Sequence, residues 1–366
     1  MLKRLFFIGC IICLFVSCEE GPAYEVKLRF SDLKPQDIYA VFEAADSKSV
    51  DTLSYDGLKD LIIRRQDGDF RTLTIYFENR TQWISVYLEP HKKVSVTGEA
   101  LYPQLLQIKG GKINDRLTAF RKEVSPLLKE QVLLLNGINA SPNGAGEKNV
   151  RLANLYHEIC SRAERFIKKN PEDEASAILI RDFFFSPDNP LQTEELLNTL
   201  SPKLDDFYVV KDLKTFCEKS KRTMAGAQAP DFNIRNVYGT PYNISSFNNR
   251  YFVLAFVATW CDKCQTDELF LDKIISSFPD DQLDVMLVSL DENPREVRDL
   301  IHNDSIRWNV VTDSAGQAIS LLDLYNVKAL PLCFLIDKDG KIILKTENGV
   351  ELEKVLEEFI EKKKGS

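Results

Sequence analysis

The chain of 366 residues is 44% hydrophobic, which is enough for two or three domains with buried cores. It carries 47 lysines and arginines against 55 aspartates and glutamates, so the formal net charge is −8. The one marked basic cluster, Lys362–Lys364, is expected to be a solvated helix end, and nucleic acid is therefore not expected as a partner.

A short apolar segment at the amino terminus predicts export. Lys3 and Arg4 precede Leu5 to Val16, which are almost wholly apolar. A membrane-spanning helix needs about 20 residues, so this shorter segment is predicted to be a signal-peptide core. It ends at Phe15-Val-Ser-Cys18, which resembles a bacterial lipoprotein box, although Phe15 stands where leucine is usual. The resemblance implies a lipoprotein signal peptide over 1–17 and a lipid on Cys18, with ordinary signal cleavage nearby as the alternative.

Residues 18–110 are predicted to form an antiparallel β domain, as one sheet or as a small sandwich. Apolar and polar residues alternate over 24–30, 71–77, 83–88 and 94–96. Turn residues at 67–68, 78–80 and 89–91 separate these segments. The aromatic residues Tyr76, Phe77, Trp83 and Tyr87 are expected in the core because they fall in alternating strands. No catalytic constellation occurs here, so a support or docking module is expected.

Residues 111–224 are predicted to be a helical region. Apolar residues recur at helical spacing from Leu117 to Leu135 and from Val150 to Phe166, with a loop predicted over 136–146. Further helices are predicted over 175–185, 193–200 and 209–222. The small residues Ala225-Gly-Ala227 follow and predict a domain boundary.

Two cysteines, Cys160 and Cys217, lie in these predicted helices. Buried free cysteine is common, so both are expected to be unpaired and structural. An oxidising envelope would also allow a disulfide between them.

The segment from Tyr251 to Phe278 carries the most specific chemistry. Tyr251–Ala258 is an almost unbroken apolar run, typical of a central strand buried on both faces. Cys261 and Cys264 follow at once, and helical spacing continues to Phe278, so the pair is predicted at the first turn of a helix. Such a position lowers a thiol pKa from about 8.5 to roughly 3.5–7.5. Cys261 is predicted to be the exposed attacking thiol, and Cys264 the thiol that resolves the mixed disulfide.

Two features of the pair bear on its chemistry. Asp262 and Lys263 between the cysteines carry opposite charges, so their net effect on the Cys261 thiol is left open. Zinc would need two further ligands, and the three histidines are scattered through the chain. A redox disulfide is therefore favoured over a metal site, and no other cofactor is expected.

The rest of the carboxy-terminal region, residues 225–366, alternates between strands and helices. A hairpin is predicted around Tyr238-Gly-Thr240, a buried strand over 283–290, and helices after Asn293 and Asp313. A second hairpin is predicted over 332–344 and a last helix over 350–360. This order predicts an α/β fold with a mixed central sheet and flanking helices.

Five segments in this region carry a resemblance to a known family. They are Gln228-Ala-Pro-Asp-Phe232, Tyr251 to Ala258, Trp260-Cys-Asp-Lys-Cys264, Val327-Lys-Ala-Leu-Pro331 and Phe334-Leu-Ile-Asp-Lys-Asp-Gly340. In order and spacing they resemble the thioredoxin-fold domain of TlpA/ResA-like envelope thiol–disulfide oxidoreductases. In its texture and in Leu88-Glu-Pro-His-Lys-Lys-Val94 and Gly111-Lys-Ile-Asn114, the upstream part resembles the β-plus-helical extension, of undefined function, found on many such bacterial lipoproteins.

The resemblance implies roles for further residues. Trp260 would pack beside the site, and Pro331 would be a cis-proline whose loop faces the disulfide and offers backbone to a substrate cysteine. Cys333 would lie on the following strand, either as buried packing or as a third redox thiol. Ala255 stands where thioredoxin has a buried proton-accepting aspartate, so proton transfer would use water or another carboxylate, for which Asp267 and Glu268 are weak candidates. Leu269 stands where a helix-kinking proline is often found, and Asp-Lys replaces the Gly-Pro dipeptide of thioredoxin.

The sequence therefore predicts a lipid-anchored thiol–disulfide oxidoreductase of the bacterial envelope, facing the periplasm and reducing substrate disulfides. Its expected partners are cysteine-containing substrate proteins, a membrane thiol protein that donates electrons, and the membrane itself through the lipid. One alternative is a binding or scaffold lipoprotein that keeps the fold without turnover. A peroxiredoxin-like peroxidase is a weaker alternative, because Ala258 replaces the threonine of the peroxidase motif.

Overall fold

The structure is a computed structural model that describes residues 23–361 apart from 67–68, 79, 141–144, 187–188, 248, 265–270, 280, 294, 296, 298–308 and 314–315. The chain divides into two compact units, residues 1–176 and 177–366, and each is described here by itself. The boundary between the units falls within α4 (Glu174–Phe184). The predicted domain limits at residues 110 and 224 stay predictions.

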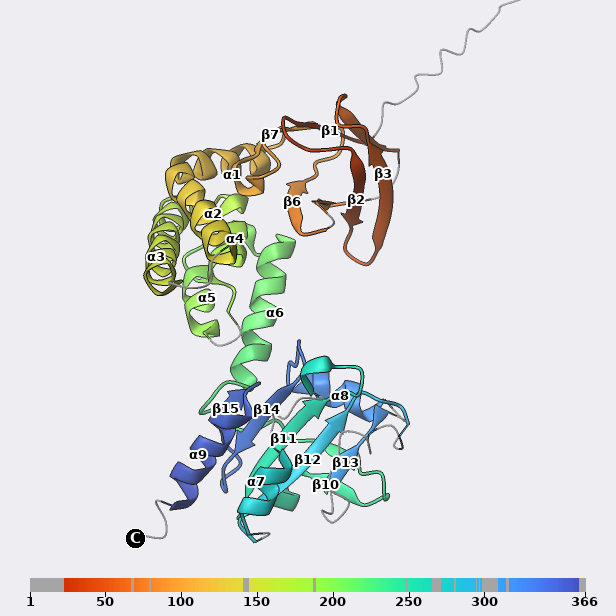
Figure 1. Cartoon of the computed structure of the whole chain (residues 1–366), viewed down its shortest axis with the longest axis vertical. Coiled ribbons are helices and arrows are strands. Elements are labelled where there is room, and N and C mark those ends of the chain that lie inside the picture. The colour runs from red at the N-terminus through yellow and green to blue at the C-terminus, as the bar shows by residue number, and fades with distance from the viewer. Residues whose placement is uncertain are drawn as a thin grey trace, which may run out of the picture. The chain divides into compact units, whose positions relative to one another are not determined.

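The first unit begins with two four-stranded sheets, which Figure 1 shows in red to orange. One sheet has the strand order β4-β1-β7-β8 and the other the order β3-β2-β5-β6. The strands are β1 (Tyr24–Phe30), β2 (Gln36–Glu43), β3 (Lys48–Tyr55), β4 (Leu61–Arg65), β5 (Thr72–Phe77), β6 (Gln82–Tyr87), β7 (Lys93–Gly98) and β8 (Gln107–Lys109). The four segments predicted as strands are all confirmed.

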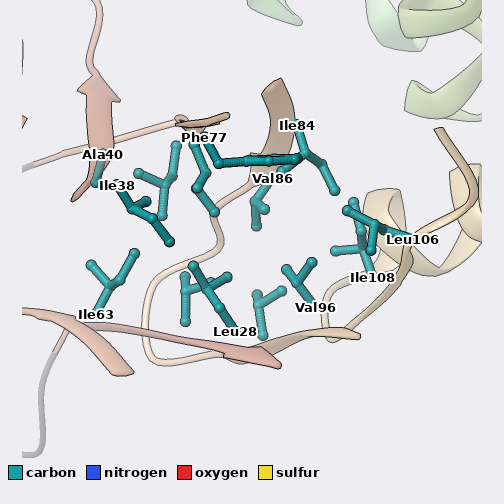
Figure 2. Close-up of a cluster of buried hydrophobic side chains, with 14 of the residues drawn as sticks. Leu28, Ile38, Ala40, Ile63, Phe77, Ile84, Val86, Val96, Leu106 and Ile108 are labelled. Carbon is teal, nitrogen blue, oxygen red and sulfur yellow. The ribbon is translucent and has the colours of Figure 1, made fainter. Parts of the chain in front are cut away.

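The two sheets bury one common core between them, as a small sandwich does. Figure 2 shows Leu28 and Val96 from one sheet pointing toward Ile38 and Phe77 from the other, and all four are buried. The expectation of purely antiparallel pairing is wrong at one place, because β1 and β7 pair in parallel. Between β1 and β7 the chain crosses to the second sheet, where it forms β2, β3, β5 and β6, and then returns to the first sheet. Parallel neighbours need a long crossover connection of this kind, whereas a short hairpin joins antiparallel ones.

The aromatic residues of this sandwich are only partly in the core. Phe77 and Tyr87 are buried as expected, whereas Tyr76 is half-buried and Trp83 is 58% exposed. Tyr76 and Trp83 are directly paired across β5 and β6, so they share one face of the sheet. That face is the outer one, and the prediction of a core position for Trp83 is therefore wrong.

Three helices complete the first unit before α4: α1 (Lys112–Glu123), α2 (Ser125–Ala140) and α3 (Ala145–Lys169). Asn114 of α1 joins the helix to β6, since its Nδ2 donates to the Tyr87 carbonyl at 2.7 Å and its Oδ1 accepts from the Tyr87 amide at 3.0 Å. The predicted loop over 136–146 is too long, because α2 continues to Ala140 and α3 begins at Ala145. Asn and Gly are only weakly unfavourable in helices, and their presence over 136–140 does not end α2.

The second unit continues with helices and then forms a five-stranded sheet. Its elements are α5 (Pro190–Leu197), α6 (Tyr208–Arg222), β9 (Asn233–Arg235), β10 (Pro241–Asn243), β11 (Tyr251–Val257), α7 (Leu271–Ser277), β12 (Leu283–Ser289), β13 (Asn309–Val311), α8 (Gln317–Leu324), β14 (Leu332–Ile336), β15 (Ile342–Thr346) and α9 (Gly349–Glu361). The sheet has the order β13-β12-β11-β14-β15, seen in Figure 1 in teal to blue. β11, β12 and β13 are parallel, and β14 and β15 are antiparallel to their neighbours, so the predicted mixed sheet is confirmed.

Helices cover both faces of this sheet, which explains why β11 is buried along its whole length. Val253, Ala255 and Val257 share one cluster with apolar residues of α7 and α9. Phe252, Leu254 and Phe256, on the other face, pack in a cluster that includes residues of α8. The helix predicted to begin at Asp313 instead has Gly316 as its N-cap, while the helix predicted after Asn293 falls largely outside the described residues.

Candidate active site

The two cysteines of the C-x-x-C motif form a disulfide bond at the carboxyl end of β11. The Cα atoms of Cys261 and Cys264 are 5.2 Å apart. The Cys261 amide donates to the carbonyl of Ala258 at 3.2 Å, and the Cys264 amide donates to the carbonyl of Cys261 at 2.9 Å. The chain therefore turns sharply directly after the central strand, and the cysteine pair lies at the end of the sheet where the carboxyl end of β11 is.

The local structure at the pair differs from the predicted first turn of an α-helix. Asp262–Cys264 form one turn of 3₁₀-helix, closed by the hydrogen bond between Cys264 and Cys261. A bond from residue i to residue i+3 is the pattern of that tighter turn. The next described helix, α7, begins at Leu271, and residues 265–270 lie outside the described part of the chain.

The expected difference in exposure between the two sulfurs is wrong for the disulfide state. Cys261 is 9% exposed and Cys264 is 8% exposed, and both belong to the apolar cluster on the α7 side of the sheet. The difference lies instead in what each residue faces. Cys261 is among the residues that line a pocket of about 550 Å³, and Cys264 is not.

This pocket brings together three of the predicted site residues. Trp260, Cys261 and Lys263 line it on one side, and a segment of four residues, Val327–Leu330, lines it on the other. The tryptophan is 66% exposed, so much of its ring is available to a bound molecule. Lys263 Nζ lies 3.9 Å from Glu347 Oε2, and both side chains are largely exposed. The pocket thus has an apolar wall and a charged rim beside the disulfide.

Pro331 follows the pocket-lining segment directly. The peptide bond between Leu330 and Pro331 is cis, as the resemblance implies, and Pro331 is buried. Pro331 lies directly before β14. Because β14 pairs with β11, it runs beside the strand that leads to Cys261.

Cys333 lies in β14 directly opposite Ala255 of β11 and is fully buried. Burial raises the pKa of the Cys333 thiol to about 12. A thiol in this state is a poor nucleophile, so the structure supports a packing role over a third redox thiol. Cys160 and Cys217 form no disulfide with one another, and burial raises the pKa of both thiols, that of Cys217 to about 11.

The sequence reasoning missed Asp291, a buried carboxylate next to the cysteine loop. Asp291 Oδ2 accepts from the Thr259 amide at 2.9 Å, and its Oδ1 accepts from the Thr259 hydroxyl at 2.6 Å. The available signal was a carboxylate directly after a buried strand, at the carboxyl edge of a parallel sheet where ligand sites gather. The two carboxylates expected from the sequence, Asp267 and Glu268, lie outside the described residues, as does Leu269.

Cys18 and the rest of the predicted signal peptide lie outside the described residues. Within the described part of the chain, no group of three or more His, Cys, Asp or Glu side chains is arranged to hold a metal ion. In the same part of the chain, no helix combines the length and hydropathy needed to cross a membrane.

Comparisons with known proteins find similarity in the part of the chain that carries the cysteine pair. Residues 225–345 match the AhpC/TSA family. The thiol-disulfide oxidoreductase ResA of Bacillus cereus is 26% identical over 147 residues, which are 40% of this chain and 83% of that protein.

Two solved structures are also similar to the carboxy-terminal part. The thioredoxin domain of a Bacteroides vulgatus thiol-disulfide oxidoreductase is 25% identical, with 37% of this chain and 96% of that chain covered and a TM-score of 0.34. A thiol-disulfide oxidoreductase from Bacteroides fragilis is 27% identical, with 36% and 98% covered and a TM-score of 0.33. The carboxy-terminal part of this chain thus has a thioredoxin fold, matches the AhpC/TSA family over residues 225–345, and is similar to ResA-like thiol–disulfide oxidoreductases.

Proposed function

We propose that this thiol–disulfide oxidoreductase is exported, carries a lipid on Cys18, and reduces disulfides in cysteine-containing proteins of the bacterial envelope. The observation that carries the proposal is the Cys261–Cys264 disulfide, in which Cys261 faces an open pocket of about 550 Å³. Exposed apolar surface beside a reactive sulfur suits an extended protein segment that contains a cysteine.

The reaction consists of two thiol–disulfide exchanges. In the reduced protein, the Cys261 thiolate attacks one sulfur of a substrate disulfide, so a mixed disulfide forms and the other substrate sulfur leaves as a thiolate. The Cys264 thiolate then attacks Cys261 Sγ, which forms the Cys261–Cys264 bond and releases the second substrate sulfur. The substrate gains two electrons and two protons, and the protein loses them. A membrane thiol protein would return them by exchange with the Cys261–Cys264 disulfide.

No cofactor beyond the cysteine pair is needed for this proposal, because the disulfide itself stores both electrons. The pocket supports Cys261, which lines it, as the residue that meets the substrate, and Cys264, which does not line it, as the one that resolves the mixed disulfide. Trp260, Lys263 and the segment before Pro331 would contact the substrate beside the new disulfide.

The direction of the reaction is tested by the reduction potential of the Cys261–Cys264 pair. A value near about −270 mV or below supports a reductase, whereas a value of about −120 to −180 mV supports an oxidase or isomerase. A pair that never equilibrates with a dithiol buffer contradicts catalysis and leaves the scaffold alternative.

Activity is tested by reduction of a model protein disulfide in the presence of a dithiol. Cys261→Ser is expected to abolish reduction. Cys264→Ser, reduced beforehand and freed of dithiol, is expected to accumulate a mixed disulfide with the substrate that persists on a non-reducing gel. Cys160→Ser is the matched control, since it removes a thiol in the other compact unit and should leave the rate unchanged. Peroxide consumption by the wild-type protein would favour the peroxidase alternative, which Ala258 disfavours.

A further inference from the structure

Asp291 lies where the carboxyl ends of β11 and β12 meet. The ladder between these strands continues past β12, since the Leu290 amide donates to the Val257 carbonyl at 3.1 Å. Asp291 follows and is only 4% exposed. Its carboxylate therefore sits directly beneath the loop that carries Thr259, Trp260 and Cys261.

Both carboxylate oxygens of Asp291 accept hydrogen bonds from this loop and from β12. Besides the two bonds from Thr259, Oδ2 accepts from the fully buried Ser289 hydroxyl at 2.5 Å. The Asp291 amide donates back to the Ser289 oxygen at 3.2 Å. A buried carboxylate is costly unless donors surround it, and here three donors meet its two oxygens.

We infer that Asp291 is a positioning residue for the disulfide chemistry proposed above, which holds the Thr259–Cys261 loop and sets a fixed negative charge behind the cysteine pair. The inference rests on the proposed function. Cys261 is two residues from Thr259, at most about 7 Å between Cα atoms, so the carboxylate lies on the order of 10 Å from the Cys261 sulfur. The hydrogen bonds fix where the loop turns, and the charge acts on the thiolate.

The sign of the charge effect follows from electrostatics. A nearby anion disfavours a thiolate, so Asp291 raises the pKa of the reduced Cys261 thiol and destabilises the reduced pair. The disulfide is then favoured and the protein becomes a stronger reductant. The charged groups that line the pocket itself, Asp262, Lys263 and Lys328, are exposed, so solvent and salt screen them more than they screen Asp291.

The chain allows the charge and the hydrogen bonds to be tested separately. In Asp291→Asn, the amide oxygen can still accept from the Thr259 and Ser289 donors, and the amide nitrogen can donate to the Thr259 hydroxyl oxygen. This variant therefore removes the charge and keeps the network. Thr259→Val keeps the charge and removes the hydroxyl bond, and Thr259→Ser restores that bond. Asp339→Asn, an exposed carboxylate on the β14–β15 turn, is the matched control for loss of one charge.

Two measurements on the full-length protein decide the inference. The equilibrium constant with a dithiol buffer gives the potential, and the alkylation rate of Cys261 against pH gives its pKa. Asp291→Asn is expected to shift the equilibrium about three- to tenfold toward the reduced pair, or about 15–30 mV, and to lower the Cys261 pKa. Thr259→Val is expected to slow exchange with a protein disulfide several-fold, with recovery in Thr259→Ser.

Each contrary result has a distinct meaning. If Asp291→Asn matches Asp339→Asn in potential and in pH profile, the charge role is overturned. If Thr259→Val and Thr259→Ser exchange at the same rate as the wild type, the positioning role is overturned, and this arm stands even where Asp291→Asn fails to fold. A wild-type protein that never equilibrates with the buffer overturns the proposed function as well.

Discussion

The reactivity of each cysteine depends on how well its surroundings stabilise the negative charge of the thiolate. Cys333 and Cys217 are both buried, and burial raises the pKa of their thiols to about 12 and about 11. Cys261 borders an open pocket, which Lys263 also lines, so a thiolate formed there can be hydrated. One chain thus contains inert and reactive thiols that composition alone does not separate.

Selective alkylation tests this difference. At pH 8 a thiol of pKa about 12 is a thiolate in about one molecule in ten thousand. In the reduced native protein, Cys261 is therefore expected to react with iodoacetamide at least about 100-fold faster than Cys333 or Cys217, as measured by mass spectrometry of the labelled peptides. In urea the cysteines should react at similar rates. Fast labelling of native Cys333 would instead revive its role as a third redox thiol.

Trp260 offers a second test at the scale of one residue. Because its side chain is 66% exposed, Trp260→Ala should change the free energy of unfolding by less than about 0.5 kcal/mol. Exposed aromatic residues at a binding pocket often dominate contacts with a protein partner, so kcat/KM for a protein disulfide should fall about tenfold. The rate with a small disulfide should change little.

Trp83→Ala is the matched control for this variant, because Trp83 is also an exposed tryptophan, at 58%, and lies in the other compact unit. It should leave both rates unchanged. Equal losses with the protein and the small disulfide would show that Trp260 acts on the chemistry rather than on substrate contact.

At this scale the sequence revealed the cysteine pair and its immediate neighbours, because a local motif carries them. It did not reveal Asp291, because the contact with Thr259 joins residues 32 positions apart and depends on the register of β11 and β12. The exposure of Cys261 was also beyond local reasoning, since apolar residues of α7 and α9 share its cluster.

At the scale of elements, α6 is bound to the segment that precedes the cis peptide bond. Asn326 Nδ2 donates to the Ser220 hydroxyl at 3.1 Å, and both residues are buried. Asn326 has a φ of 52°, in the left-handed region that asparagine tolerates better than most residues. Because Val327 follows at once and lines the pocket, α6 supports one wall of the active site.

Two neighbouring substitutions on α6 should therefore differ in their effect on stability. Ser220→Ala leaves the buried Asn326 amide without this acceptor and should lower the free energy of unfolding by about 1–3 kcal/mol. Lys219→Ala removes an ion pair with Asp323 whose partners are 35% and 68% exposed, and should cost at most about 1 kcal/mol. The free energy of unfolding can be measured from the urea dependence of Cys333 alkylation, because Cys333 is fully buried in β14 and becomes accessible when the sheet unfolds. Equal effects of the two substitutions would contradict this account of α6.

Periodicity predicted most elements, and its failures have physical causes. β11 was recognisable because a strand covered on both faces is apolar throughout. The parallel pairing of β1 with β7 could not be predicted, because the alternation of apolar and polar residues shows which face of the sheet a residue occupies but not the direction of the neighbouring strand. The loop over 136–146 was overestimated because Asn and Gly were read as a break where α2 continues.

At the scale of the whole molecule, the known chemistry lies in the second unit. The match to the AhpC/TSA family covers residues 225–345, and the described part of the first unit has its own sandwich core. The β-sandwich itself cannot take part in thiol–disulfide exchange, because residues 23–109 contain no cysteine. The role of the first unit as a support or docking module stays a prediction.

The lipid anchor is the prediction that concerns the molecule as a whole. If the chain is cut before Cys18 and the thiol is acylated, the protein should fractionate with membranes and take up labelled palmitate. Cys18→Ala should abolish the label and release the protein from the membrane fraction, because the lipid on Cys18 is the proposed anchor. Cys13→Ala, within the same apolar leader, is the matched control and should behave as the wild type. Release of the wild-type protein in soluble form would favour ordinary signal cleavage. In that case the reductase would diffuse to its substrates, and its electron donor need not be confined to the membrane surface.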